Sequence, residues 1–351
     1  MTYYFANVNT DTIPWAQLEQ SPDSTCFFSP QWHDYLRRMG TSLYAVSISC
    51  GGTTLGYFIG SRLRLIIKII WAPSMGTGTY SQGLCMFNPT PQNERIEIYR
   101  QLTEWLFRTH RAHYIQVCDW QMRTDSKEWI DNWSNPLLDA AGIHYQPRLT
   151  YYLDLNKSEE ELWSNLHYKS CKYAINKAKK QGLYVRFVEN EKDIDAFVNQ
   201  HHNHVADVLR RKKNRGLPCQ SKKNINALCH ALFPDRILMA EVIAPDNDGN
   251  SQSISSGTFV LDNKVGSYFT AASYQRFMHL CPNELMMWEG IRAMHARGCS
   301  SLILGGVAHY KKKFDPILAF VPVMVFSKFK FLVNIRMHIK KLYQRLIHIF
   351  R

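Results

Sequence analysis

The sequence predicts a mixed α/β fold with two lobes in tandem and an amphipathic helix at its C-terminal end. At 351 residues the chain is long for one hydrophobic core and suits two lobes of ordinary size. Its 45% hydrophobic and 13% aromatic content is ample for folded cores. The order helix, short basic turn, apolar strand occurs at 98–120 and again at 284–306. We therefore expect lobes at residues 1–150 and 151–320, and a basic amphipathic tail at 321–351.

The first lobe is expected to contain a helix capped by Ser29, with Pro30 at the first helical position. Gly51 and Gly52 separate two apolar segments and predict a hairpin. Glycine, proline, serine and threonine predict a long loop at 72–91. In chain order we expect a helix to Arg38, hairpin strands at 43–49 and 55–59, a strand at 62–71, that loop, a helix at 94–110, a strand at 114–120, a helix at 135–142 and a strand at 151–155.

The segment from Ser158 to Gly182 is the one around which the chain is organised. Ser158 and Glu161 form the pair that caps a helix reciprocally, and Gly182 suits the residue after a helix end, so one helix is predicted. One face carries an apolar stripe of Tyr168, Cys171, Ile175 and Ala178. Another carries Lys169, Lys172, Asn176 and Lys180 without an acid. These lysines either contact an anionic substrate or are merely solvated.

The second lobe continues with alternating strands and helices. A strand is expected at 184–188, a helix at 192–209, strands at 237–244, 255–261 and 264–272, a helix at 283–297 and a strand at 301–305. Residues 210–223 are the most basic segment and contain no acid. His201, His202 and His204 could suggest a metal site, but a polar helix face is the preferred interpretation because ligand-spaced carboxylates are lacking.

The net charge, the cysteine content and the absence of certain motifs indicate which partners, compartment and binding sites to expect. A formal charge of +13 favours an anionic partner, such as nucleic acid, a phosphorylated substrate or an acidic lipid surface. Nine cysteines without a C-x-x-C pair indicate a reduced compartment and no zinc site. Walker and Rossmann glycine motifs are absent, and no secretion signal is expected. The longest apolar run, 317–326, is too short to span a bilayer.

The tail repeats apolar residues at helical spacing and carries only basic charges. The stripe consists of Leu332, Ile335, Ile339, Leu342, Leu346 and Ile349. Such a helix either docks on the second lobe or lies on an anionic membrane surface through residues 327–351.

Several motifs resemble the Fem-type (FemAB-like) transferases, which build peptidoglycan interpeptide bridges and belong to the wider GNAT clan. Residues 172–183 are similar to the family pattern R-x-x-I-R-K-A-x-K-x-G-[LV], with Lys172 and Asn176 in place of its two arginines. Between 267 and 315 the chain resembles the family's closing half, which ends in F-K-x-x-F-G. That ending reads YKKKFD here, so Lys311 falls on the family's lysine and Asp315 on its glycine. Ser29-Pro30-x-Trp32 also resembles the family's N-terminal region.

The resemblance implies two GNAT-like lobes and a bacterial N-acyltransferase of cell-envelope biogenesis. Acyl-coenzyme A or aminoacyl-tRNA would be the donor, and an amine of a peptidoglycan or surface-polysaccharide precursor, free or lipid-linked, the acceptor. The enzyme would be cytoplasmic or peripheral at the inner face of the plasma membrane, without a metal. The implied catalytic residues are Lys311, which would steady negative charge, Tyr310 and Tyr268. The implied substrate-binding residues are Trp32, Lys172, Asn176, Lys177 and Phe314, and the donor-binding ones Thr270, Ala271, Asn283 and Glu284.

The sequence leaves three questions open. The proton acceptor is Tyr268, Asp119 or Glu241. A tRNA donor would bind its phosphates along the basic segment 210–223. Coenzyme A would instead bind at the strand–helix junction 267–285. The R/Q-x-x-G-x-G/A loop that usually binds coenzyme A is absent from the sequence. The rival to an enzyme is a non-catalytic basic protein that binds nucleic acid or acts as a membrane-surface scaffold.

Overall fold

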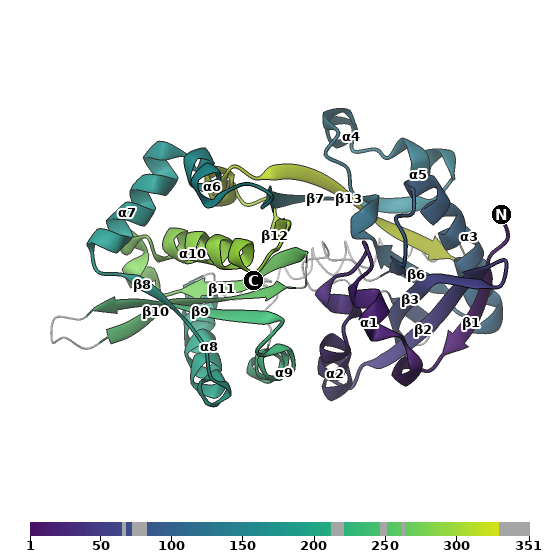
Figure 1. Ribbon diagram of the computed structural model, residues 1–351, viewed down its shortest axis with the longest axis horizontal. Coiled ribbons are helices and arrows are strands. Elements are labelled where there is room, and N and C mark those ends of the chain that lie inside the picture. Colours follow the sequence, from purple (N-terminus) through teal and green to yellow (C-terminus); the bar gives the residue numbers. More distant parts are fainter. Residues whose placement is uncertain (65–67, 72–82, 212–220, 246–250, 262–263, 330–351) are drawn as a thin grey trace, which may run out of the picture. The chain divides into compact units, whose positions relative to one another are not determined.

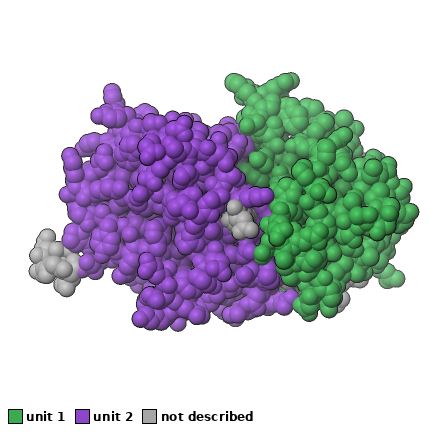
Figure 2. All heavy atoms as spheres, viewed as in Figure 1, with its two compact units in different colours: residues 1–23, 41–148, 320–351 green, residues 24–40, 149–319 purple. Residues whose placement is uncertain are grey.

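The computed structural model describes the chain except residues 65–67, 72–82, 212–220, 246–250, 262–263 and 330–351 (Figure 1). It forms two compact units, coloured separately in Figure 2. Unit 1 contains residues 1–23, 41–148 and the chain from Phe320 on, and unit 2 contains 24–40 and 149–319. The main division at 148/149 lies close to the expected 150/151. The units are not contiguous segments, however, because 24–40 belongs to unit 2 and the described part of the expected tail begins within unit 1.

Unit 1 is built on a sheet with strand order β1-β2-β3-β4-β6-β13, with β5 paired to β3. Its strands are β1 (Tyr4–Val8), β2 (Ser42–Cys50), β3 (Thr53–Arg64), β4 (Lys68–Trp71), β5 (Leu84–Met86), β6 (Tyr114–Cys118) and β13 (Ile317–Ser327). All pairings within it are antiparallel except that of β4 with β6. Helix α3 (Gln92–Thr109) covers this sheet with a buried stripe that includes Ile98, Leu102 and Leu106. The shorter helices are α1 (Trp15–Glu19), α4 (Lys127–Asn132) and α5 (Pro136–Ala140).

Several unit 1 elements differ from the expected ones. The apolar run at 62–71 is not one strand, because residues 62–64 end β3 and 68–71 form β4, which returns antiparallel to β3. Strand β5 lies inside the segment expected to be a loop. Residues 317–327 form strand β13 beside β6, so the first residues of the expected tail are sheet. The amphipathic helix predicted beyond them, and most of the basic segment 210–223, lie outside the described residues.

Unit 2 has the strand order β7-β12-β11-β10-β9-β8. Its strands are β7 (His144–Asp154), β8 (Tyr184–Phe187), β9 (Ile237–Pro245), β10 (Ser251–Leu261), β11 (Val265–Ser273) and β12 (Ser301–Gly306). Among the described residues of unit 2, only β11 and β12 are paired in parallel. Helix α10 (Pro282–Ala296) covers one face, with α7 (Tyr173–Lys180) against it, and α8 (Ile194–Arg211) and α9 (Lys222–Leu232) cover the other (Figure 1). Helix α2 (Pro30–Arg38), capped by Ser29 as predicted, packs against α9.

The segment predicted as one helix from 158 to 182 is two helices joined by a π turn. The capping box of Ser158 and Glu161 is present and starts α6 (Glu159–Asn165). The chain then extends, and the His167 N–H donates to the Lys313 carbonyl at 3.0 Å, which ends the helix by a tertiary contact. A π turn at Tyr168–Lys172 leads into α7. Cys171 is buried as expected, whereas Tyr168 is 77% exposed.

The described part of the chain contains no helix that is both long and apolar enough to cross a bilayer.

Close packing between α10 and β10 depends on Gly290. A Cβ built at this position would lie 2.1 Å from Cζ of the buried Phe259 ring. Overpacking of this kind typically costs about 1–3 kcal/mol. We therefore expect Gly290→Ala to lower the free energy of unfolding by about 2 kcal/mol, measured by urea denaturation.

The double variant Gly290→Ala with Phe259→Leu serves as the control, because the smaller side chain vacates the space that the new methyl group needs. It should be more stable than the sum of the two single changes indicates. Additive losses would show that Gly290 matters for another reason.

Candidate active site

Strands β11 and β12 run together only at their beginnings. Residues 265–267 pair with 301–303, and no later residue of β11 pairs with β12 in the described structure. Both strands carry an extra residue just beyond this point. Phe269 is the extra residue in β11, because Thr258 pairs with Thr270 and Phe259 with Tyr268. Leu304 is the extra residue in β12. Bulges of this type redirect side chains and end pairing, and they are frequent next to active sites.

The bulge in β11 places the side chains of Tyr268 and Thr270, which are two residues apart, on opposite faces of the sheet. The Tyr268 ring packs 5.3 Å from the Phe259 ring, on the face that α10 covers. The Thr270 hydroxyl instead lies 2.9 Å from His201 Nε2 on α8. Without the extra residue the two side chains would share a face, since alternate strand residues point the same way. The free edge of β11 therefore presents groups to both faces.

Lys311 lies at the end of β12 with its ammonium group buried. It belongs to the 3₁₀ turn His309–Phe314, and it is 7% exposed. Its Nζ donates to the Leu304 carbonyl at 2.5 Å and to the Gly306 carbonyl at 3.0 Å. Gly305 between them has a φ of 75°, a left-handed conformation that favours glycine. An ammonium has three N–H groups, so one remains for a substrate atom.

Burial lowers the pKa of Lys311 to about 8. Removing an ammonium group from water disfavours its charged form, and neutral carbonyls compensate for this less than a carboxylate would. No carboxylate of the described chain forms an ion pair with Lys311. The group is still mostly protonated at pH 7. An uncompensated positive charge held in this way can stabilise a negative charge that develops nearby.

Tyr268 and Tyr310 flank the Lys311 ammonium. Each ring centroid lies 5.8 Å from Nζ, within the range of a cation–π contact. Burial raises the pKa of Tyr310, and a hydrogen bond from Tyr268 opposes this rise. Tyr310 remains 40% exposed. The structure thus brings together the three residues expected to be catalytic.

The three consecutive lysines of the turn have different surroundings. Lys311 points inward and Lys312 is exposed. Lys313 forms an ion pair with Glu284 in the first turn of α10. Glu284, expected to bind the donor, therefore neutralises Lys313 instead of offering a site for an anion.

The first turn of α10 lies close to this ion pair. Cys281 precedes it with a φ of 61°, Pro282 is its first residue, and no side chain caps its N–H groups. Asn283 Oδ1 accepts a hydrogen bond from the Ser273 hydroxyl at 2.5 Å, so this side chain holds α10 to β11. The main-chain N–H groups of the turn are the donors that remain for an anion.

The positively charged helix α7 borders the same turn. Burial raises the pKa of the Cys281 thiol, Glu284 adds to this rise, and Lys177 and Lys313 oppose it, which shows that the two lysines lie near the start of α10. Lys172 Nζ donates to the Ser164 carbonyl at 2.9 Å. Asn176 is exposed on the helix surface. Of the three helix residues expected to bind substrate, Lys177 is the one that electrostatics places beside α10.

Two residues expected to bind substrate lie in the core of unit 2. Trp32 is 2% exposed and packs between Phe27 and Tyr35, at 4.9 and 5.0 Å between ring centroids. Phe314 is 3% exposed within the hydrophobic core under α10. Both side chains are buried there, and their contact with a substrate stays a prediction. Asp315, which follows, has a φ of 57° and takes the left-handed conformation for which the family uses glycine.

The three candidate proton acceptors are now distinguishable. Asp119 is fully buried and holds Arg95 at 2.7 Å and the Tyr99 hydroxyl at 2.7 Å inside unit 1, so it is part of a core network. Glu241 is 5% exposed and pairs with Arg186 at 2.7 Å on the α8 face. Tyr268 lies beside Lys311. Of the three, only Tyr268 is in contact with the lysine.

The remaining donor-site candidates lie on the free part of β11. Ala271 is exposed and pairs with Gly257, and Thr270 is half-buried against His201. His201 and His204 were not expected to point inward, yet they are 2% and 0% exposed. The two histidines are spaced from Phe197 so that they continue the buried stripe of α8. This spacing is the signal in the sequence from which their burial could have been predicted. Within the described residues no group of three potential metal ligands occurs.

Comparison with known proteins shows what this part of the chain is similar to. Residues 166–312 match the acetyltransferase (GNAT) domain family. No curated protein matches the chain in sequence. Among solved structures the chain is similar to the crystal structure of FemX, with a TM-score of 0.67 and 13% identity over 92% of this chain and 97% of FemX.

Two further structures share the fold at lower similarity. A tandem GNAT protein from the clavulanic acid biosynthesis pathway has a TM-score of 0.51 and 10% identity over 93% of this chain and 98% of that one. L-PGS from Bacillus licheniformis has a TM-score of 0.51 and 9% identity over 95% of both chains. These findings confirm the predicted resemblance: residues 166–312 match the acetyltransferase (GNAT) domain family, and the chain shares the tandem α/β fold of FemX.

Proposed function

We propose that this acyltransferase moves an acyl or aminoacyl group onto an amine of a cell-envelope precursor, at the ends of β11 and β12 in unit 2. The observation that carries the proposal is the Lys311 ammonium, buried between two main-chain carbonyls with one N–H to spare. When an amine attacks an ester or thioester, the carbonyl oxygen becomes negatively charged. A fixed donor that already lies in a dry site stabilises this charge without reorganising.

The donor is a molecule that carries phosphate groups. Support comes from the uncapped first turn of α10, with Lys177 nearby, and from the unpaired edge of β11. The match to the GNAT domain favours acyl-coenzyme A. Aminoacyl-tRNA is the alternative, and the two are separated by offering each donor with the same amine.

The acceptor proposal rests on two similar structures, FemX and L-PGS. We propose an amine on a peptidoglycan or surface-polysaccharide precursor, in the cytoplasm or at the inner face of the membrane. Lys172 and Asn176 are proposed to contact it from α7 and the turn before it, and Tyr310, partly exposed beside Lys311, to line its approach. Contact with an anionic membrane through 327–351 stays a prediction.

Replacement of Lys311 tests the proposal directly. Lys311→Met keeps the length of the side chain and removes its charge, so kcat should fall about a hundredfold or more. The fold should persist, because the cost of burying the charge disappears together with its two hydrogen bonds. We expect the melting temperature to change by less than about 4 °C.

The matched control is Lys312→Met, which removes an exposed charge one residue away and should leave turnover within about twofold. Equal effects of the two changes would show that the lysines form a solvated run. A large loss of melting temperature in Lys311→Met alone would indicate a structural role for Lys311.

The pKa of Lys311 predicts an alkaline limit to activity. Burial holds this pKa near 8, below its ordinary value, so the ammonium donor is present below pH 8 and is lost as the pH rises through it. We expect kcat/KM to decline above pH 8 with an apparent pKa of about 8. The residual activity of Lys311→Met should lack this decline, and a profile that rises through pH 9 in the wild type would contradict the assignment.

The role of Lys177 is tested by donor affinity. Lys177→Ala should weaken binding of acetyl-coenzyme A about fivefold at 50 mM salt, and the difference should shrink at 300 mM as exposed charges become screened. Calorimetry measures both affinities. Lys180→Ala, an exposed lysine on the same helix, is the control and should leave the affinity unchanged. Equal loss in both variants would mean that only the net charge matters.

A further inference from the structure

A chain of four hydrogen-bonding side chains runs through the buried interface between α8 and the sheet of unit 2. The Thr270 hydroxyl lies 2.9 Å from His201 Nε2. His201 Nδ1 lies 2.8 Å from Ser256 Oγ, and Ser256 Oγ lies 2.7 Å from His204 Nδ1. His204 Nε2 lies 3.1 Å from the Ser253 carbonyl oxygen. In the first three contacts each partner can either donate or accept a hydrogen bond. In the last contact the Ser253 carbonyl only accepts.

The last contact favours one direction of the chain. A carbonyl only accepts, so when His204 Nε2 donates to Ser253 it carries the proton, and its Nδ1 accepts from the Ser256 hydroxyl. Ser256 Oγ then accepts from His201 Nδ1–H, and His201 Nε2 accepts from the Thr270 hydroxyl. The proton of Thr270 is thereby committed to His201. Thr270 Oγ1 then has two lone pairs, of which one can accept from the Thr258 hydroxyl 3.4 Å away and the other from the N–H of an amine.

The neighbouring Gln200 side chain also allows the hydrogen bonds of the chain to run in the opposite direction. Gln200 Nε2 lies 3.1 Å from His204 Nε2, and it also lies 3.2 Å from the Ser253 carbonyl. If His204 Nε2 loses its proton, the Gln200 amide can donate to it. Each of the other bonds then reverses without movement of a heavy atom. The chain is therefore built for two states that differ by the passage of one proton.

Burial lowers the pKa of both histidines and so favours the neutral form that such a chain requires. Burial, together with the neighbouring His204 and His202, lowers the pKa of His201 to about 4. Burial also lowers the pKa of His204, while its bond to Ser253 and the carboxylates of Glu241 and Asp207 oppose this. A neutral imidazole has one donor and one acceptor nitrogen. Besides the two histidines themselves, three titratable groups act on the pair: His202, Glu241 and Asp207.

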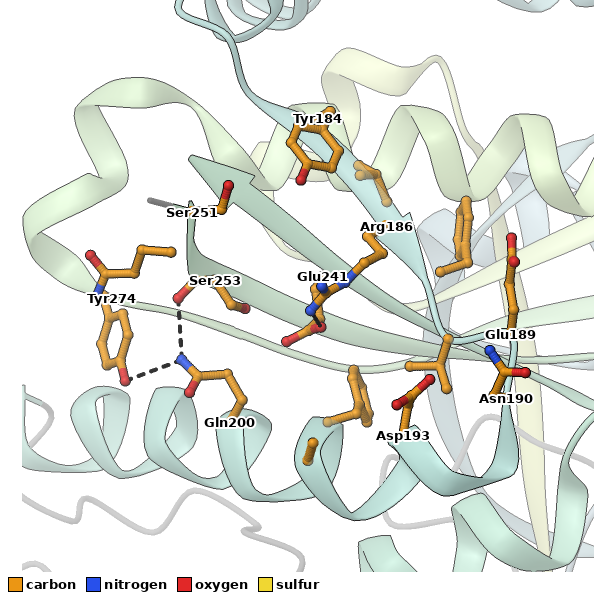
Figure 3. A pocket seen from close by; sticks show the side chains of 16 residues that line it. Tyr184, Arg186, Glu189, Asn190, Asp193, Gln200, Glu241, Ser251, Ser253 and Tyr274 are labelled. Carbon is orange, nitrogen blue, oxygen red and sulfur yellow. Dashed lines mark hydrogen bonds and ion pairs between the residues drawn. The ribbon is translucent and has the colours of Figure 1, made fainter. Parts of the chain in front are cut away.

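Thr270, at one end of the chain, is more open than the other three members. Thr270 is half-buried on the unpaired edge of β11, one bulge residue beyond Tyr268, which contacts Lys311. Ser256 and His204 are 0% exposed. The two groups in contact with His204 Nε2, Gln200 and Ser253, help to line a polar cavity of about 980 Å³. Figure 3 shows Gln200 reaching from α8 to Ser253 and Tyr274 at this cavity, with Glu241 and Arg186 in contact further along it.

We propose that Thr270, His201, Ser256 and His204 form a proton relay that takes the amine proton released during acyl transfer to the cavity beside α8. The proposal rests on the proposed acyl transfer. The amine nitrogen forms the new bond to the acyl carbon, and the leaving group departs with the electron pair of the broken bond. The amine proton passes to Thr270 Oγ1 as the Thr270 proton passes to His201 Nε2.

The remaining transfers follow the same atoms. The Nδ1 proton of His201 moves to Ser256 Oγ, the Ser256 proton moves to His204 Nδ1, and the Nε2 proton of His204 moves to a water molecule in the cavity. One proton enters and one leaves, so no side chain ends with a charge. Thr270 is the catalytic member that touches the substrate, and the other three are positioning and relay residues.

Tautomer assignment by NMR tests the chain without a substrate. In the wild-type protein with ¹⁵N-labelled histidine, His201 should carry its proton on Nδ1 and His204 on Nε2, and both should stay neutral from pH 6 to 8. Assignment comes from His201→Gln and His204→Gln. A protonated ring in this range, or the same tautomer in both rings, overturns the relay.

Kinetics then test its use in catalysis. Thr270→Val keeps the shape and breaks the relay, so kcat should fall about a hundredfold with little change in KM, whereas Thr270→Ser should stay within about fivefold of the wild type. Ser256→Ala should lower kcat in the same way and remove the multi-proton solvent isotope effect of the wild type. The assays use the donor and amine that give turnover when acetyl-coenzyme A and aminoacyl-tRNA are screened.

The outcomes separate the relay from the proposed function. Turnover that depends on Lys311 but is unchanged in Thr270→Val overturns the relay and leaves the acyl transfer standing. Loss of kcat in Thr270→Ser equal to that in Thr270→Val would also overturn it, since the serine hydroxyl preserves the path. Absence of turnover with every donor and amine overturns both.

Discussion

A lysine ammonium that is buried without a carboxylate is the constraint on which the site depends. Lys311 can stay charged there only because the Leu304 and Gly306 carbonyls point at it from both sides of Gly305. That arrangement needs the extra residue at Leu304 and the left-handed turn that follows. The end of β12 is thus shaped around one charge. Since nothing else in the described surroundings neutralises that charge, a substrate oxygen that becomes negative is its natural partner.

The rest of unit 2 holds the donor and acceptor groups around this charge. The bulge at Phe269 turns Tyr268 toward Lys311 and Thr270 toward α8, so the two faces of one strand end serve different purposes. On one face lie the lysine and the uncapped first turn of α10. On the other lies the buried histidine pair. Acyl transfer to an amine needs one group that stabilises negative charge on the carbonyl oxygen and another that accepts the proton leaving the amine nitrogen.

Local signals in the sequence predicted the elements well, and tertiary contacts account for most differences. The Ser158 and Glu161 cap, the Ser29 cap and the hairpin at Gly51 are found where expected, because each depends on neighbouring residues. The break after α6 was not predictable, since it follows from a bond to the Lys313 carbonyl, which is distant in sequence. Strand β13 was missed for the same reason: its partner β6 lies about two hundred residues earlier.

Sequence motifs predicted the candidate site where the motif determines a main-chain turn. They did not predict the direction in which a side chain points. Lys311 with its two tyrosines is assembled as the resemblance implied, whereas Trp32 and Phe314 turn into the core. The inward histidines continue a buried stripe on α8, but Ser256, which joins them, is more than fifty residues away.

The most direct test of the account is the mass of the acceptor amine after incubation with donor and enzyme. Wild-type protein should add one acyl or aminoacyl group to it, and Lys311→Met should add almost none while still binding the donor. Equal addition by both proteins would contradict the account.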